Sequence, residues 1–193
     1  MAKRESTLGN MLMALSVITL VASASLGAVY TITSEPIALA MLAKKNNAIR
    51  EVIPEFNNDP SDEVYKVPVD GDTLYFYTGR LDGALVGTAV ETFTMIGFSG
   101  EIRVMVGLLP DGTIHDVTVL KHAETPGLGD KMDKKKSDWS SQFRGKDPRD
   151  YRLSVKKDGG DVDAITASTI SSMAFCDAVS RAYNTYVKEV QKN

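Results

Sequence analysis

The sequence predicts an α+β protein in which a single N-terminal transmembrane helix precedes a domain with an antiparallel sheet and a C-terminal amphipathic helix. Three observations support this class. Residues 11–32 carry no charge, residues 64–120 hold β-rich segments separated by turn signals, and residues 169–190 repeat apolar side chains at helical spacing. Strand patterns follow one another without alternating helices, and no G-x-G-x-x-G precedes a helix, so a Rossmann-type nucleotide site is disfavoured.

The composition narrows the classes of function. The chain has 193 residues and a net charge of −3, so it lacks the basic excess of a nucleic-acid-binding protein. The basic run Lys134–Lys136 is flanked by Asp133 and Asp138 and indicates a solvated face. Cys176 is the only cysteine, which excludes an internal disulfide and an iron–sulfur cluster held by this chain alone. Two histidines are too few for a typical closed zinc site, so any electron transfer here needs an organic cofactor.

The uncharged run is predicted to span a membrane. As a helix, residues 11–32 would extend about 33 Å, which is enough for the hydrocarbon core of a bilayer. The alternative is a cleaved signal peptide, because Ala22-Ser23-Ala24 resembles a cleavage site. The anchor is favoured because the apolar run continues to Ile32. Either interpretation makes residues 1–10 a cytoplasmic N-terminus and places residues 35–193 outside the cytoplasm, since Lys3 and Arg4 stay inside.

A helical linker is expected over residues 33–62, before a domain that occupies residues 63–193. Pro36 suits the first turn of a helix that runs to about Ile53, and Pro54 ends it. Residues 57–62 then form a polar break.

The sheet is predicted from segments rich in β-branched and aromatic residues. Asp70-Gly71 is a hairpin signal, and Pro110-Asp111-Gly112 is a second strong turn. The expected strands cover residues 64–69, 73–77, 84–95, 102–108 and 113–120, with a last strand at about 152–156.

The last helix is predicted to pack its apolar stripe on this sheet. Cys176 lies at the shoulder of the stripe and is interpreted as a small buried hydrophobe. The stripe consists of Phe175, Val179, Ala182, Tyr183, Tyr186 and Val190.

Hydroxyl side chains gather where this helix begins. Residues 161–172 read DVDAITASTISS, with small alanines between the hydroxyl-bearing residues. A helix start presents free backbone N–H groups and a favourable dipole to an anion, so a phosphate could bind or be esterified there. Plain N-capping by serine and threonine explains the same composition without any ligand. The chemistry of the residues leaves both interpretations open.

The segment Asp163–Thr169 resembles the flavinylation motif of the FMN-binding domain family. That family includes the G subunit of the Rnf complex and the C subunit of the sodium-pumping NADH:quinone oxidoreductase. The resemblance implies that a magnesium-dependent flavin transferase joins FMN to Thr169 as a phosphoester. Asp163 would open the motif, and Thr166 would take its Ser/Thr position. Ala167 stands where the family has glycine, and Ser168, where it has alanine, is a rival acceptor.

A second stretch resembles the same family. Residues 97–102, 106–107, 111–114 and 124–129 match its G-Y-x-G-x-I, V-G, D-G-x-I and E-T-P-G-L-G series in order and spacing. The match implies that the loop from Glu124 to Gly129 holds the flavin. Its backbone N–H groups would bond the polar edge of the ring, Thr125 would add a hydroxyl, and Leu128 would pack on the ring.

The resemblance implies an electron-carrying subunit, with no catalytic triad of its own, in an ion-pumping membrane complex that couples ferredoxin and NAD. Its cofactor would be covalent FMN, which makes it a phosphoprotein. Its partners would be the other membrane subunits and, during maturation, the flavin transferase. The flavin domain would face the periplasmic or extracytoplasmic side of the inner (plasma) membrane. Two alternatives stay open: the C-type quinone reductase subunit, and a membrane-tethered binding module without flavin.

Overall fold

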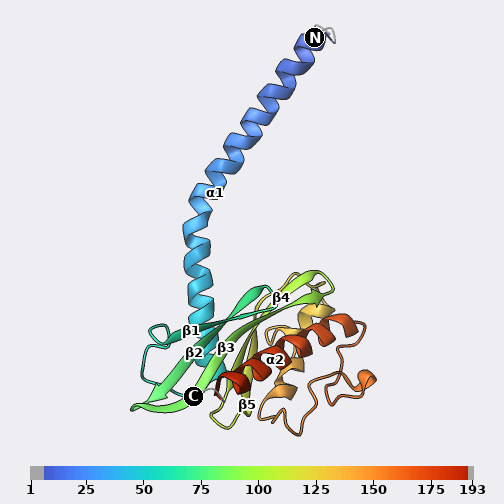
Figure 1. Ribbon diagram of the computed structural model, residues 1–193. Coiled ribbons are helices and arrows are strands. Elements are labelled where there is room, and N and C mark those ends of the chain that lie inside the picture. The colour runs from blue at the N-terminus through green and yellow to red at the C-terminus, as the bar shows by residue number, and fades with distance from the viewer. Residues whose placement is uncertain (1–6, 191–193) are drawn as a thin grey trace. The chain divides into compact units, whose positions relative to one another are not determined.

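The computed structural model describes residues 7–190, which form two compact units that divide between Lys44 and Lys45. The expected cytoplasmic N-terminus at 1–10 lies largely outside the described residues, and so do Lys3 and Arg4. All five strands and the last helix belong to the second unit (Figure 1).

The first helix, α1, covers Leu8–Val52 without interruption. Pro36 lies inside it and not at the start of a second helix, so the segment expected as a helical linker is continuous with the uncharged run. Hydroxyl groups in the apolar part bond back to the helix: Thr19 Oγ1 donates to the Leu15 carbonyl at 2.9 Å, and Ser25 Oγ donates to the Val21 carbonyl at 2.8 Å. Among the described residues, α1 is the one helix long and apolar enough to cross a membrane, a test that a signal sequence also passes.

The sheet is an antiparallel meander of five strands in sequence order. Asp70 and Gly71 have φ values of 49° and 85° and join the first two strands, which is the left-handed backbone that a two-residue hairpin turn requires. The strands are β1 (Val64–Val69), β2 (Asp72–Leu81), β3 (Ala84–Gly97), β4 (Gly100–Leu108) and β5 (Ile114–Lys121).

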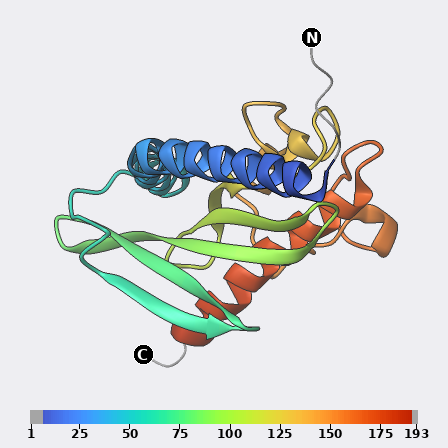
Figure 2. The ribbon, with the colours of Figure 1, turned by 90° about the horizontal axis from the view of Figure 1, so that it is seen from above.

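The helix α2 (Thr169–Val190) has the predicted bounds and crosses one face of the sheet (Figure 2). Its stripe is buried at Phe175, Val179, Ala182 and Tyr186, whereas Val190 is exposed. Cys176 is buried, as predicted, and burial raises the pKa of its thiol to about 12.

The opposite face of the sheet is covered by the last turns of α1, which belong to the second unit from Lys45 onward. Ala48, Ile49 and Val52 are buried there with Tyr77 and Met105. The backbones approach closely: a Cβ atom on Gly107 would lie 1.7 Å from the Val52 carbonyl oxygen. The centre of β3 is therefore buried on both faces.

The prediction of a strand at residues 152–156 is wrong. That stretch makes a single parallel bridge, Val155 to Val162, and the 3₁₀ turn η3 (Lys156–Asp158) follows. Arg152 N–H donates to Asp161 Oδ2 at 2.8 Å, so the segment folds back on its own neighbours. A β-rich composition does not make a strand where no sheet edge is within reach. Two other 3₁₀ turns are η1 (Gly129–Met132) and η2 (Trp139–Phe143).

Candidate functional site

A pocket of about 370 Å³ opens at the start of α2. It lies where that helix end meets the 124–129 loop and the turn between β3 and β4, and both views place the helix start and the turn close together (Figures 1 and 2). The volume lies in the range of ligand pockets, roughly 300–1,000 Å³. The lining residues are Phe98, Glu124, Thr125, Leu128, Ala167, Ser168, Thr169, Ile170 and Ser171.

The first turn of α2 offers donors to this pocket. The first bond inside the helix runs from Ser172 N–H to the Ser168 carbonyl at 3.1 Å, so the N–H groups of residues 169–171 precede the ladder. The helix dipole adds partial positive charge at the same place. An anion such as a phosphate is therefore favoured beside Thr169.

The two candidate acceptors, Ser168 and Thr169, differ in their surroundings. Ser168 Oγ lies 2.9 Å from Ser171 Oγ, and Ser171 Oγ donates in turn to Glu124 Oε2 at 2.5 Å. The hydroxyl of Ser168 is therefore held in a chain that leads into the protein. Within residues 7–190, Thr169 Oγ1 makes no hydrogen bond, and Thr169 lines the pocket.

Glu124 joins the three walls of the pocket. Its side chain is buried, its Oε1 accepts a hydrogen bond from Ser99 N–H at 2.9 Å, and its Oε2 accepts from Ser171. Ser99 lies in the β3–β4 turn, and Ser171 lies in the first turn of α2. Because both carboxylate oxygens are engaged inside the protein, we assign Glu124 to positioning the walls.

Gly129 does not line the pocket but allows its walls to meet. A Cβ atom there would lie 2.5 Å from Ser171 Oγ and 2.8 Å from Glu124 Oε2. On the other side of the carboxylate, a Cβ atom on Gly97 would lie 2.9 Å from Glu124 Oε1. Any larger residue at either position would push the carboxylate away from its donors.

Asp163 and Thr166 lie outside the pocket lining. Thr166 is exposed. The Asp163 carboxylate is also exposed and pairs with Lys156 Nζ at 2.7 Å. Its backbone is fixed, because Trp139 Nε1 donates to the Asp163 carbonyl at 2.5 Å and Asp163 N–H donates to Gln142 Oε1 at 2.8 Å. The motif therefore has an outward-facing first half and a second half that faces the pocket.

Three lining residues were not among the sequence candidates: Phe98, Ile170 and Ser171. Phe98 lies within residues 97–102, one of the segments that resemble the FMN-binding domain family. Its aromatic ring beside two glycines could therefore have identified it as a site residue. Ser171 is directed into the protein by its hydrogen bond to Glu124, which is 47 positions away in the chain. No local sequence pattern could therefore have identified Ser171 as a site residue.

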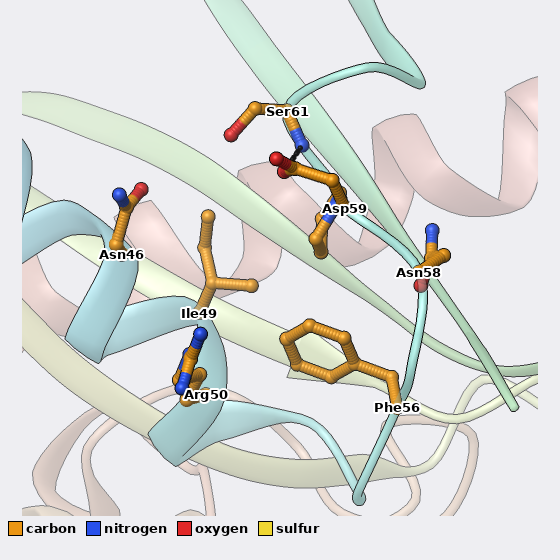
Figure 3. A pocket seen from close by; sticks show the side chains of 8 residues that line it. Asn46, Ile49, Arg50, Phe56, Asn58, Asp59 and Ser61 are labelled. Atoms are coloured by element: carbon orange, nitrogen blue, oxygen red, sulfur yellow. Dashed lines mark hydrogen bonds between the residues drawn. The ribbon is translucent and has the colours of Figure 1, made fainter.

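A second, smaller pocket of about 210 Å³ lies between the last turns of α1 and residues 56–61 (Figure 3). Asn46, Ile49 and Arg50 approach it from the helix, and Asp59 and Ser61 approach it from the loop. Its polar groups are partly used to fix the loop: Asp59 Oδ1 accepts a hydrogen bond from Ser61 N–H at 2.9 Å. The pocket beside α2 combines an apolar wall with free donors, so it is the better candidate of the two.

Comparison with known proteins identifies the family of this domain. Residues 97–184, which include every lining residue, match the FMN-binding domain family. The chain is 42% identical over 140 residues, which are 68% of this chain and 67% of the relative, to the G subunit of the ion-translocating oxidoreductase complex of Erwinia tasmaniensis.

Two further relatives carry the same name. The protein from Aliivibrio fischeri is 33% identical over 192 residues, which are 92% of this chain and 90% of the relative. The protein from Haemophilus influenzae is 34% identical over 162 residues, which are 80% of this chain and 78% of the relative. The chain therefore belongs to the family of ion-translocating oxidoreductase complex G subunits and contains an FMN-binding domain.

Proposed function

We propose that this protein is the electron-carrying flavoprotein subunit of an ion-pumping ferredoxin:NAD oxidoreductase complex, with FMN joined through its phosphate to Thr169. The observation that carries the proposal is the free hydroxyl of Thr169, in the pocket and at the helix start that favours an anion. The names of the relatives support a G-type subunit over the C-type subunit of the quinone reductase.

The residues of the pocket fit FMN in two parts. The N–H groups of residues 169–171 would hold the phosphate, and Thr166, Ala167 and Ser168 would shape the motif that presents Thr169. Phe98, Leu128 and Ile170 would pack on the ring, and Thr125 would offer a hydroxyl to its polar edge. When bound, FMN supplies one-electron chemistry, and the protein holds the ring and tunes its potential.

The attachment step that we propose needs a flavin transferase and FAD. A bond forms between Thr169 Oγ1 and the FMN phosphorus of FAD, the phosphoanhydride bond breaks, AMP leaves, and the hydroxyl proton is released. Asp163 faces solvent beside Lys156, away from the pocket. We therefore assign Asp163 to recognition by the transferase rather than to contact with the bound flavin.

The location that we propose follows from α1. Residues 11–32 would span the inner (plasma) membrane once, residues 33–44 would link the span to the domain, and the domain from Lys45 onward would hold the flavin on the periplasmic side. A covalent link suits this location, because FMN lost outside the cell is not replaced.

Intact mass tests the attachment site. Full-length protein co-expressed with a flavin transferase should gain the mass of one FMN less one water, because the phosphoester replaces the hydroxyl proton and a phosphate hydroxyl. Thr169→Ala should abolish the gain, whereas Thr169→Ser should retain it because it keeps a hydroxyl at the same place. Ser168→Ala is the matched control and should gain one FMN, because the Ser168 hydroxyl is bound to Ser171.

Two results would refute this assignment. An unmodified wild-type protein from cells that modify a known flavinylated protein would favour the binding module without flavin. A gain retained by Thr169→Ala and lost by Ser168→Ala would move the acceptor to Ser168.

A further inference from the structure

Glu124 is a buried carboxylate that no cation neutralises. It is 4% exposed, and both of its oxygens accept hydrogen bonds, which is the pattern of an ionised side chain. Within residues 7–190 it forms no ion pair, and its two donors, an N–H group and a hydroxyl group, carry no charge. Buried charges are usually paired, because an unpaired charge costs free energy in the interior of a protein.

Two other buried carboxylates of this domain are neutralised. Glu91 pairs with Lys45 Nζ at 2.9 Å, and Asp116 pairs with Lys134 Nζ at 2.8 Å. The missing cation is therefore a property of the Glu124 position and not of buried acids throughout this fold.

A second buried carboxylate without a cation lies in the same segment of the chain. Asp130 follows Gly129 directly and is 7% exposed. Its Oδ1 has no hydrogen-bond partner, and in the described part of the chain Asp130 makes no ion pair. Uncompensated negative charge therefore lies at both ends of the 125–129 loop, which holds the flavin in the proposed function.

The lining of the pocket adds no positive side chain. Among the lining residues, all of which the structure describes, Glu124 is the one ionisable side chain. Lys121, three positions earlier in the chain, pairs with Glu101 at 2.9 Å, and Lys131 lies outside the lining. A flavin in this pocket would therefore meet a net negative wall.

The hydrogen bonds of Glu124 place its charge beside the proposed position of the ring. Its two donors, Ser99 and Ser171, are the chain neighbours of Phe98 and Ile170, which line the pocket and would pack on the ring. Water screens a buried carboxylate only weakly, so its field reaches a ring on the far side of these side chains. Reduction brings negative charge onto the ring, and this field opposes it.

We propose that Glu124 determines the reduction potential of the flavin: its uncompensated carboxylate lowers the potential at which the flavin accepts an electron, and Asp130 acts in the same direction. The inference rests on the proposed function, since it needs FMN in the pocket. It gives Glu124 a second role besides positioning the walls. A flavin of lower potential is a stronger reductant toward the next carrier, which suits an electron-carrying subunit.

A redox titration of the full-length flavinylated protein, followed by the visible absorption of FMN, tests the proposal. Glu124→Gln removes the charge, and the amide oxygen can still accept from Ser99 N–H. We expect the reduction equilibrium to shift toward reduced flavin by on the order of ten-fold, which is a rise of about 59 mV for one electron. Asp147→Asn is the matched control for net charge. It removes a carboxylate from an exposed pair, so the potential should stay unchanged.

Two further variants separate the charge from the shape of the pocket. Ser171→Ala breaks the hydrogen bond to Glu124 Oε2 but keeps the carboxylate, so the potential should not rise. Asp130→Asn removes the second uncompensated charge and leaves the bonds between the walls in place, so the potential should rise. This variant replaces Glu124→Gln in the test if Glu124→Gln does not fold or does not carry FMN.

The outcomes separate this inference from the proposed function. An unchanged or lower potential in Glu124→Gln overturns the inference, and so does an equal rise in Ser171→Ala, which would indicate loosened walls. Where Glu124→Gln does not fold or does not carry FMN, an unchanged potential in Asp130→Asn has the same meaning. Absence of FMN from the wild-type protein, measured by intact mass, refutes the proposed function itself. Equal potentials in fully flavinylated proteins refute only the role of Glu124.

Discussion

Ala167 adopts a backbone conformation that is unfavourable for a residue with a Cβ atom. Its φ is 60°, in the left-handed region, and it lies two residues before α2 begins. The motif that this segment resembles has glycine at that position, and glycine adopts this conformation without a steric penalty. Alanine at this position therefore keeps the turn of the motif, and we expect it to lower the free energy of unfolding.

Ala167→Gly should raise the free energy of unfolding by about 1 kcal/mol, because relief of the left-handed strain outweighs the added chain entropy. Ala164→Gly is the matched control: Ala164 is exposed, lies in the same loop and has no positive φ, so it should give no gain. Thermal unfolding followed by Trp139 fluorescence measures both. A lower midpoint for Ala167→Gly would contradict this account.

Asp116 on β5 anchors the irregular segment between the sheet and α2. Its carboxylate is buried and accepts bonds from Lys134 Nζ at 2.8 Å and from Arg144 Nη2 at 2.5 Å. Lys134 also contacts Glu51 at 2.9 Å. The expectation that the basic run is a solvated face is wrong for Lys134, whose side chain is only 18% exposed.

These bonds set the ionisation of Asp116. Burial alone would raise its pKa, but hydrogen bonds from Lys134, from Arg144 and from Val117 N–H outweigh burial and hold the pKa below its ordinary value. The stabilisation is therefore fully present above the unfolded aspartate pKa of about 4. It is lost as the pH falls through the lower pKa of the folded protein.

Asp116→Asn should lower the free energy of unfolding at pH 7 by about 1–3 kcal/mol, because it removes the charge that holds two cations. The difference from the wild type should shrink as the pH falls below about 4. Denaturant titrations at several pH values measure it. Asp147→Asn breaks the exposed pair with Arg149 and should change stability little, as a control. A difference that stays constant down to low pH would refute the assignment.

The whole domain depends on a sheet covered on both faces. One face packs α2, and the other packs the last turns of α1, whose Ile49 and Val52 are 2% and 0% exposed. The domain core therefore begins at Lys45, well before the first strand. A boundary drawn at residue 63 would leave Tyr77 and Met105 without the side chains that cover them.

A fragment of residues 45–193 should fold cooperatively without the membrane segment, since it keeps both layers. A fragment of residues 53–193 should fail to do so. It lacks Ala48, Ile49 and Val52, and their burial contributes roughly 4–6 kcal/mol, which is comparable with the whole stability of a typical domain. Circular dichroism and urea titration of the two fragments make the comparison. Equal urea midpoints would show that the α1 cover is dispensable.

The sequence determined the features that arise from local periodicity and turn chemistry. The bounds of α2, the hairpin at Asp70-Gly71 and the positions of five strands follow from repeats of 3.6 and 2 residues and from backbone preferences. The loop at 124–129 and the helix start at 163–169 were identified as site segments by their motifs, and the pocket joins them. The expected strand at 152–156 failed because strand formation needs a partner that composition does not reveal.

The tertiary structure decided which side chains meet. The buried carboxylate of Glu124 accepts hydrogen bonds from Ser99 and Ser171, and Lys134 pairs with the buried carboxylate of Asp116. The last turns of α1 cover the second face of the sheet. The tertiary structure also tied the end of β3 to α2 through the hydrogen bond from Thr94 to Asp177. Such contacts join residues that lie tens of positions apart, so they depend on chain packing and leave no periodic trace in the sequence.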